Sequence, residues 1–187
     1  CLGCLLNLKS SFQRQGGFFS AMFRKMFGGE NFFLGKYEHP DGGKLTFAPS
    51  IPGHVEHRQL TNNSLNIMAG GFLACTPGVN IKAKFGGLKA LFSGEGAFLL
   101  EASGSGDLFF NSFGGVVEKQ INGEFIVDTG HVVAFDPSLD YKITGMGSFK
   151  STMLSGEGMV MRFSGNGKLY LQTRNVSSIA SWLTPRL

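Results

Sequence analysis

The stretch "GGFLACTPGVNIK", residues 70–82, recurs sixty residues later as "GHVVAFDPSLDYK", residues 130–142, without a gap. The two copies share glycine, alanine, proline and lysine at matching places, namely Gly70 with Gly130, Ala74 with Ala134, Pro77 with Pro137 and Lys82 with Lys142. Coincidences at a fixed period are the sequence signature of a repeat architecture. This pair therefore predicts that the chain is built of similar units.

A second motif sets a carboxylate among small residues just before an apolar run. It is written "FSGEGAFLL" around Glu95, "LSGEGMVMR" around Glu157 and, in a more divergent form, "FGGENFFLG" around Glu30. A glycine, a charged residue and alternating apolar positions follow each copy, in "GDLFF" (106–110), "GKLYL" (167–171) and "GKLTF" (43–47). We predict one domain over residues 1–187, with pseudo-repeats at about 27–91, 92–153 and 154–187, the last one partial.

The composition and the pattern of apolar runs predict an all-β fold. The chain has 28 glycines and 19 phenylalanines among 187 residues, but only 16% charged residues. Short apolar or alternating runs are bounded by Gly, Ser, Asn, Asp or Pro, which is how many-stranded β-proteins read. These runs are "AFLLEA", "DLFFNS", "EFIVDT", "HVVAFD", "KLYLQT" and "MVMRFS".

Turns and two helices complete the predicted elements. Asn122-Gly123 predicts a hairpin turn, because this pair tolerates positive φ. The "SGSG" and "SGNG" stretches predict turns as well, and "TPG" (76–78) and "DPS" (136–138) predict proline turns. Apolar residues at helical spacing in 16–29 and 175–183 predict short amphipathic helices that flank the sheets.

In order along the chain, "FGGENFF", "GFLACTPGV", "LFSGEGAFLL", "FIVDTGHVVAFDPSLDYKI" and "SGNGKLYLQTRN" resemble the altered-inheritance-of-mitochondria family, over roughly residues 16–183. The resemblance implies three units similar to the tryptophan-RNA-binding attenuation protein, each a small double-stranded β-helix or sandwich. It implies homo-oligomers, with trimers favoured, and a cytoplasmic location in bacteria or a mitochondrial one in eukaryotes. It brings no catalytic residues.

The start of the chain departs from the family pattern. Members usually carry an upstream β segment, whereas "CLGCLLNLKSSFQRQ" stands here. Either the chain is truncated or its first unit is completed by something else. No run of about 18 apolar residues occurs, so we expect no transmembrane segment.

The repeated carboxylates Glu30, Glu95 and Glu157 are the first candidate site. Paired carboxylates can perform acid–base chemistry, but an active site rarely recurs in every copy of a structural repeat. Glycine before a strand already explains the motif as a turn. We therefore interpret the three residues as turn residues, with a shared oligomer axis as the one functional alternative.

Metal, redox and nucleophilic sites find little support. His54 and His57 are three apart, so in a strand they point to opposite faces and need a bulge to share a metal. Cys1 and Cys4 form a lone C-x-x-C, and Cys75 stands alone. We predict no catalytic, cofactor-binding or metal residues and no cofactor.

Three classes of function remain, of which we favour a non-enzymatic oligomeric β-scaffold involved in membrane-associated organisation. Its membrane or partner face is the predicted helix with Phe19, Met22, Phe23 and Met26 on one side and Arg24 and Lys25 on the other. The alternative is nucleic-acid binding through a ladder that contains Lys82 and Lys142, consistent with a net charge of only +4. An enzyme has no supporting constellation of residues.

Overall fold

The computed structural model describes residues 9–14, 33–38, 40, 43–85, 98–145 and 159–184. The elements are β1 (Lys9–Arg14), β2 (Phe33–Glu38), β3 (Val55–Met68), η1 (Ala69–Gly71), β4 (Phe72–Cys75), β5 (Val79–Phe85), β6 (Phe98–Asn111), β7 (Val116–Asp128), η2 (Thr129–His131), β8 (Val132–Phe135), β9 (Leu139–Gly145), β10 (Met159–Gln172) and α4 (Val176–Leu183). Within these ranges strands dominate and α4 is the one α-helix, which confirms the all-β class.

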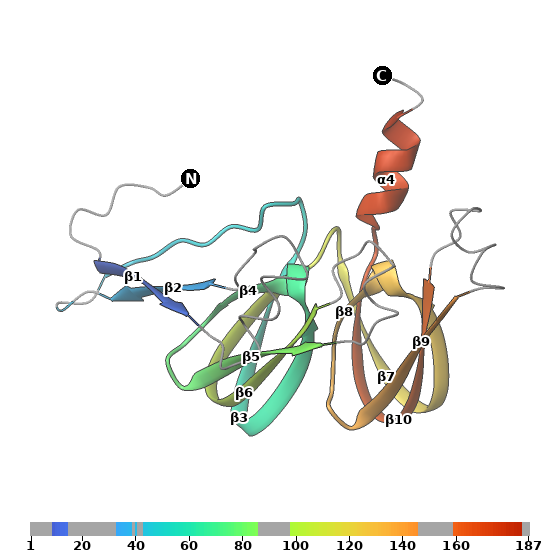
Figure 1. Cartoon of the computed structure of the whole chain (residues 1–187), viewed down its shortest axis with the longest axis horizontal. Helices are drawn as coiled ribbons and strands as arrows, with labels where there is room; N and C mark the ends of the chain where they lie inside the picture. Colours follow the sequence, from blue (N-terminus) through green and yellow to red (C-terminus); the bar gives the residue numbers. More distant parts are fainter. Residues whose placement is uncertain are drawn as a thin grey trace.

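The strands form two antiparallel sheets. A two-stranded sheet pairs β1 with β2, and the eight-stranded sheet runs in the order β4-β6-β3-β8-β10-β7, with β5 on β6 and β9 on β10. Figure 1 shows this second sheet curled into two bodies that lie side by side, one holding β3 to β6 and the other β7 to β10. We call residues 55–111 the first unit and residues 116–172 the second unit.

The two units have the same order of elements. Each begins with a long strand, passes through a three-residue 3-10 helix into a four-residue strand and a seven-residue strand, and ends in a 14-residue strand. They are joined because β8 pairs with β3, through Asn66 opposite Phe135 and Ile67 opposite Ala134. The division of the whole chain into three units stays a prediction.

The predicted hairpin turn at Asn122-Gly123 is wrong, and so are the turns at "SGSG" and "SGNG". Asn122 and Gly123 lie inside β7, opposite Asn166 and Gly165 of β10, while "SGSG" lies inside β6 and "SGNG" inside β10. Gly123 and Gly165 both have positive φ, of 105° and 123°. Facing glycines in this conformation let a long ribbon coil without breaking its pairing.

Both predicted proline turns are present. Val79 N donates to Thr76 O at 3.0 Å, and Leu139 N donates to Asp136 O at 3.1 Å. In each unit the turn returns the chain from the four-residue strand to the next strand.

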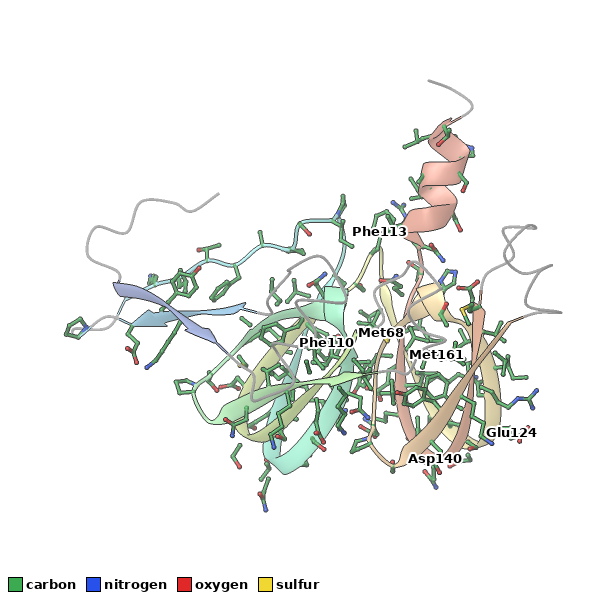
Figure 2. All side chains as sticks on the ribbon, viewed as in Figure 1. Met68, Phe110, Phe113, Glu124, Asp140 and Met161 are labelled. Carbon is green, nitrogen blue, oxygen red and sulfur yellow. The ribbon has the colours of Figure 1, made fainter. Side chains whose placement is uncertain are left out.

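Two apolar clusters fill the units and interlock at their boundary. The first includes Phe110 and Leu65 but also Val133 and Ala134 from β8, and the second includes Phe163 and Met161. Met68 of β3 packs against the second cluster, and in Figure 2 it lies between Phe110 and Met161. Each fully buried aliphatic or aromatic side chain contributes about 1.5–3 kcal/mol, so the shared clusters bind the units firmly together.

The helix predicted at 175–183 is confirmed as α4. Asn175 caps it, since Asn175 O accepts a hydrogen bond from Ile179 N at 3.3 Å, and its side chain accepts from Ser178 N. The helix stands away from the sheets in Figure 1, and Phe113 lies near its base in Figure 2. The other predicted helix, 16–29, lies outside the described residues.

Candidate functional site

A group of charged and polar side chains lies where the two units meet. This junction cluster comprises Arg58 of β3, Glu118 of β7, Asp136 of the proline turn, and Lys168 and Tyr170 of β10. Lys168 and Tyr170 are two residues apart on one strand and so share a face of the sheet. Tyr170 also lies directly opposite Glu118.

The ion pair between Arg58 and Asp136 links the first unit to the second. Arg58 Nη1 lies 2.9 Å from Asp136 Oδ1, and the two side chains are only 22% and 18% exposed. The geometry is that of a charge contact rather than a hydrogen bond, because Oδ1 has no hydrogen-bond donor. Partial burial shields the pair from salt, so it is stronger than an ordinary surface pair.

The other carboxylate oxygen of Asp136 fixes the turn to its own unit. Lys168 N donates to Asp136 Oδ2 at 2.9 Å, and Asp136 N donates to Lys168 O at 2.9 Å. Asp136 is thus held in place before it meets Arg58, which lowers the entropy that the ion pair must overcome.

Tyr170 connects this pair to a second, more exposed one. Its hydroxyl accepts a hydrogen bond from Arg58 Nη1 at 3.0 Å, and its backbone lies directly opposite Glu118 of β7. Lys168 Nζ lies 2.8 Å from Glu118 Oε1, with both side chains about half exposed. The hydrogen bond from Lys168 lowers the pKa of Glu118, and the same contact raises the pKa of Lys168.

The chemistry of the junction cluster favours a structural role. The two acidic side chains, Glu118 and Asp136, and the two basic side chains, Lys168 and Arg58, neutralise each other. Burial raises the pKa of Tyr170, so its hydroxyl keeps its proton. Each polar group already contacts a neighbour within the cluster. We interpret the cluster as a lock that fixes the position of one unit on the other.

The equivalent place in the first unit carries different residues on the same backbone frame. Thr76 N donates to Asp107 O at 2.9 Å, and Asp107 N donates to Thr76 Oγ1 at 2.8 Å. Thr76 and Asp107 thus stand where Asp136 and Lys168 stand in the second unit. His57 Nε2 lies 2.8 Å from Asp107 Oδ1. In this pair Asp107 holds the position of Lys168, and His57 holds the position of Glu118. The His57 ring also stacks on Phe109.

Two groups of candidates that were predicted from the sequence fall outside the part of the chain that the structure describes. Glu30, Glu95 and Glu157 lie outside the described residues, each two or three positions before the first residue of β2, β6 or β10. The predicted membrane face, Phe19, Met22, Phe23, Arg24, Lys25 and Met26, also lies outside them. Their roles therefore remain predictions.

His54 and His57, the histidines considered as metal ligands, have different partners. His54 lies 3.4 Å from Glu56, whereas His57 pairs with Asp107. In the part of the chain that the structure describes, no three His, Cys, Asp or Glu side chains gather to hold a metal ion. Cys75 is a free thiol whose pKa is raised by burial.

Lys82 and Lys142 are both exposed, at the same place in β5 and β9. Lys82 lies opposite Glu101, however, and Lys84 pairs with that glutamate at 3.1 Å. An acidic residue therefore interrupts the basic ladder, and nucleic-acid binding stays a prediction of the sequence.

Sequence reasoning missed the junction cluster. Its signal lay in the repeats, where Asp136 and Lys168 replace Thr76 and Asp107. The difference between Thr76 and Asp136 can be interpreted only when β8 is known to pair with β3, because that pairing brings Arg58 to Asp136.

The architecture defines a class of all-β proteins in which similar curled antiparallel units follow one another along the chain. The chain belongs to the family described as mitochondrial biogenesis AIM24, whose model matches residues 3–174. It is 33% identical over 171 residues to the uncharacterized protein M6_Spy0233 of Streptococcus pyogenes serotype M6, covering 90% of this chain and 69% of that protein.

A solved structure shares the fold. The X-ray crystal structure of protein SPYM3_0169 from Streptococcus pyogenes superposes with a TM-score of 0.77 at 28% sequence identity, over 100% of this chain and 87% of that one. No described helix is long and apolar enough to cross a membrane.

Proposed function

We propose that the protein is a non-enzymatic β-scaffold that assembles into a homo-oligomer, with a trimer favoured. One observation carries this proposal: the junction cluster and both apolar clusters serve to join one unit to the next. The ion pair of Arg58 and Asp136, the least exposed among the described residues, lies at the boundary between the two units rather than at an open site. A scaffold needs rigid joints of this kind.

We further propose that the chain contains three related units of the double-stranded β-helix type. The pairing of β1 with β2 resembles that of β5 with β6 and of β9 with β10. Each is an antiparallel pair of two consecutive strands that are separated by a long stretch of sequence, namely residues 15–32, 86–97 and 146–158. Glu30, Glu95 and Glu157 come shortly before β2, β6 and β10 in turn. This common placement supports β1 and β2 as the remaining part of an N-terminal unit.

The oligomer is tested by the native mass of the full chain. Sedimentation velocity over a wide range of protein concentrations should give a species of three chains, each of 20.1 kDa. A single-chain mass at every concentration would refute the oligomeric scaffold.

The membrane part of the proposal rests on residues 16–29 and gains support from α4. Val176 and Leu183 of α4 are 52% and 43% exposed, so the helix presents aliphatic surface. No acidic residue occurs between Gly158 and the last residue, Leu187. Apolar helices with nearby cations bind anionic lipid surfaces.

Co-sedimentation with vesicles that contain phosphatidylserine tests this part. We expect the wild-type chain to pellet with these vesicles and the double variant Arg24→Glu/Lys25→Glu to pellet less. Vesicles of phosphatidylcholine alone are the control for charge. Equal and negligible binding of both proteins would remove the membrane role and leave the scaffold role untouched.

A further inference from the structure

The two 3-10 helices hold the same place in the two units but carry different side chains. η1 reads "AGG" and follows Met68, whereas η2 reads "TGH" and follows Asp128. Met68 and Asp128 are equivalent, because each lies opposite the second residue of the 14-residue strand of its unit. Their backbones agree as well, with φ and ψ of −62° and 139° at Met68 and of −60° and 134° at Asp128. The difference between the two places therefore lies in the side chains.

On the first unit, this place receives the second unit. Met68 packs against the apolar cluster of the second unit. Gly71 is buried, and a Cβ on it would lie 3.3 Å from both Ile67 Cγ2 and Val133 Cγ1. Val133 belongs to β8 of the second unit and is only 2% exposed. We call Met68 and Gly71 the receiving surface, because one must be apolar and the other small for the second unit to pack here.

On the second unit, Asp128 stands where Met68 stands on the first. The carboxylate of Asp128 accepts a hydrogen bond from Gly130 N at 2.7 Å, and the hydroxyl of Thr129 donates to Met159 O at 2.9 Å. If a further unit packed here as the second unit packs on the first, the carboxylate would enter an apolar cluster. Burying a carboxylate without a cation costs far more free energy than burying a methionine contributes.

His131 stands where Gly71 stands on the first unit. Its Nδ1–H donates to Gln172 O at 2.8 Å, since a carbonyl oxygen can only accept. The equivalent carbonyl of the first unit belongs to Asn111, because Asn111 and Gln172 are the last residues of β6 and β10. That carbonyl lies 3.5 Å from a Cβ on Gly71, next to Val133. The imidazole of His131 therefore takes up the space into which a further unit would have to insert.

One neighbouring position differs in the opposite sense. Ile126 of β7 is equivalent to Asn66 of β3, and it is 49% exposed whereas Asn66 is buried. A single exposed aliphatic side chain is ordinary on a protein surface. A buried carboxylate without a partner is not, so Asp128 and His131 decide what can pack at this end of the second unit.

We propose that Asp128, Thr129 and His131 form a cap that ends the series of units at this face. The cap prevents a further unit of the same type, on a second copy of this chain, from packing on the second unit as the second packs on the first. Repeat proteins need terminal repeats with a polar outer face, since a contact between unlike surfaces that does not close produces filaments. The cap goes beyond the proposed scaffold by excluding one face as the contact between its copies.

Exchanging the cap for the receiving surface tests this directly. The full chain with Asp128→Met, Thr129→Ala and His131→Gly carries at 128–131 the residues that it already folds at 68–71. Sedimentation velocity over a wide range of concentrations should show self-association at least about tenfold stronger than that of the wild type. The same sedimentation in both proteins would overturn the cap.

Glu124→Met is the matched control for added apolar surface. It removes one negative charge and adds one methionine, as Asp128→Met does, at an exposed position of the same strand. We expect Glu124→Met to sediment like the wild type. If it associates as strongly as the exchanged protein, apolar surface alone causes the association, and the cap is refuted.

Gly71→His tests the same geometry on the first unit. The imidazole should meet Val133 and lower the urea midpoint by about 1 M or more. Gly70→His is the matched control, because Gly70 is exposed and a Cβ on it meets nothing within 4 Å. Val133→Ala should cost less stability beside Gly71→His than in the wild type, since the two side chains compete for one space. Equal midpoints for the two histidine variants would overturn the receiving surface.

These outcomes are independent of the proposed oligomer. Each variant is compared with the wild type whatever the native mass of the wild type is. A single-chain native mass would refute the oligomer and leave the cap supported if the exchanged protein alone associates. An oligomeric wild type whose mass the exchange does not change would refute the cap and leave the scaffold.

Discussion

Arg58 shows at the scale of a residue how one side chain holds two units together. It contacts Asp136 as an ion pair and Tyr170 through a hydrogen bond, with its guanidinium 5.8 Å from the centre of the Tyr170 ring. Nothing in "HVEHRQL" marks this arginine, because its partners lie 78 and 112 positions further along the chain. Contacts of this kind depend on strand order, which short sequence patterns do not encode.

Arg58→Met should destabilise the fold. The substitution keeps an unbranched apolar stem but leaves the mostly buried Asp136 carboxylate without its cation. We expect a loss of about 1–3 kcal/mol in the free energy of unfolding, less than the cost of breaking a fully buried pair. Urea unfolding measures it.

Lys119→Met is the matched control at the equivalent position of the second unit. Lys119 Nζ lies 4.9 Å from the centre of the Phe125 ring, and loss of this contact should cost less than about 1 kcal/mol. Equal losses for the two variants would contradict the role of Arg58 at the junction.

Glu118 should make stability depend on pH in the acidic range. Its folded-state pKa lies below the ordinary value of 4.5, chiefly because Lys168 donates a hydrogen bond to it. The stabilisation is therefore present above pH 4.5 and is lost as the pH falls through the lower, folded-state pKa. Glu118→Gln should flatten this part of the stability–pH curve.

Thermal unfolding across the acidic range at low and at high salt measures the effect of Glu118. Because the pair with Lys168 is exposed, high salt should shrink the difference between wild type and variant. A difference that grows as the pH falls below 4.5 would have the wrong sign for this account.

At the scale of the element, the sequence predicted β-structure well but divided the long strands wrongly. The runs "AFLLEA" and "DLFFNS" proved to be parts of one strand, β6, and "MVMRFS" and "KLYLQT" parts of β10. The glycines between them suggested turns, yet Gly104 and Gly106 keep their pairing with β3. Whether a glycine reverses a chain or only coils it depends on the strand opposite, which a local pattern does not contain.

Gly104→Ala should destabilise β6 more than Gly123→Ala destabilises β7. Both positions have positive φ, 126° and 105°, so each substitution carries backbone strain of about 1–2 kcal/mol. A Cβ on Gly104 would also lie 2.3 Å from Gly78 O, whereas a Cβ on Gly123 meets nothing within 4 Å. Unfolding midpoints in urea should therefore fall further for Gly104→Ala, and equal midpoints would contradict the close packing of β6 on the proline turn.

At the scale of the whole molecule, the sequence predicted the repeat, and the structure shows how the two units are joined. The repeat at 70–82 and 130–142 marks turns and strands that the structure places identically in the two units. The sequence did not predict that β8, besides pairing with β10 of its own unit, also pairs with β3 of the other unit. Pairing between distant strands is decided by which apolar faces can cover one another.

The central claim is that these units form an oligomeric scaffold, and the native mass of the full chain tests it most directly. Sedimentation velocity should show an oligomer, with three copies of the 20.1 kDa chain favoured. A protein that sediments as one chain at every concentration would contradict the account.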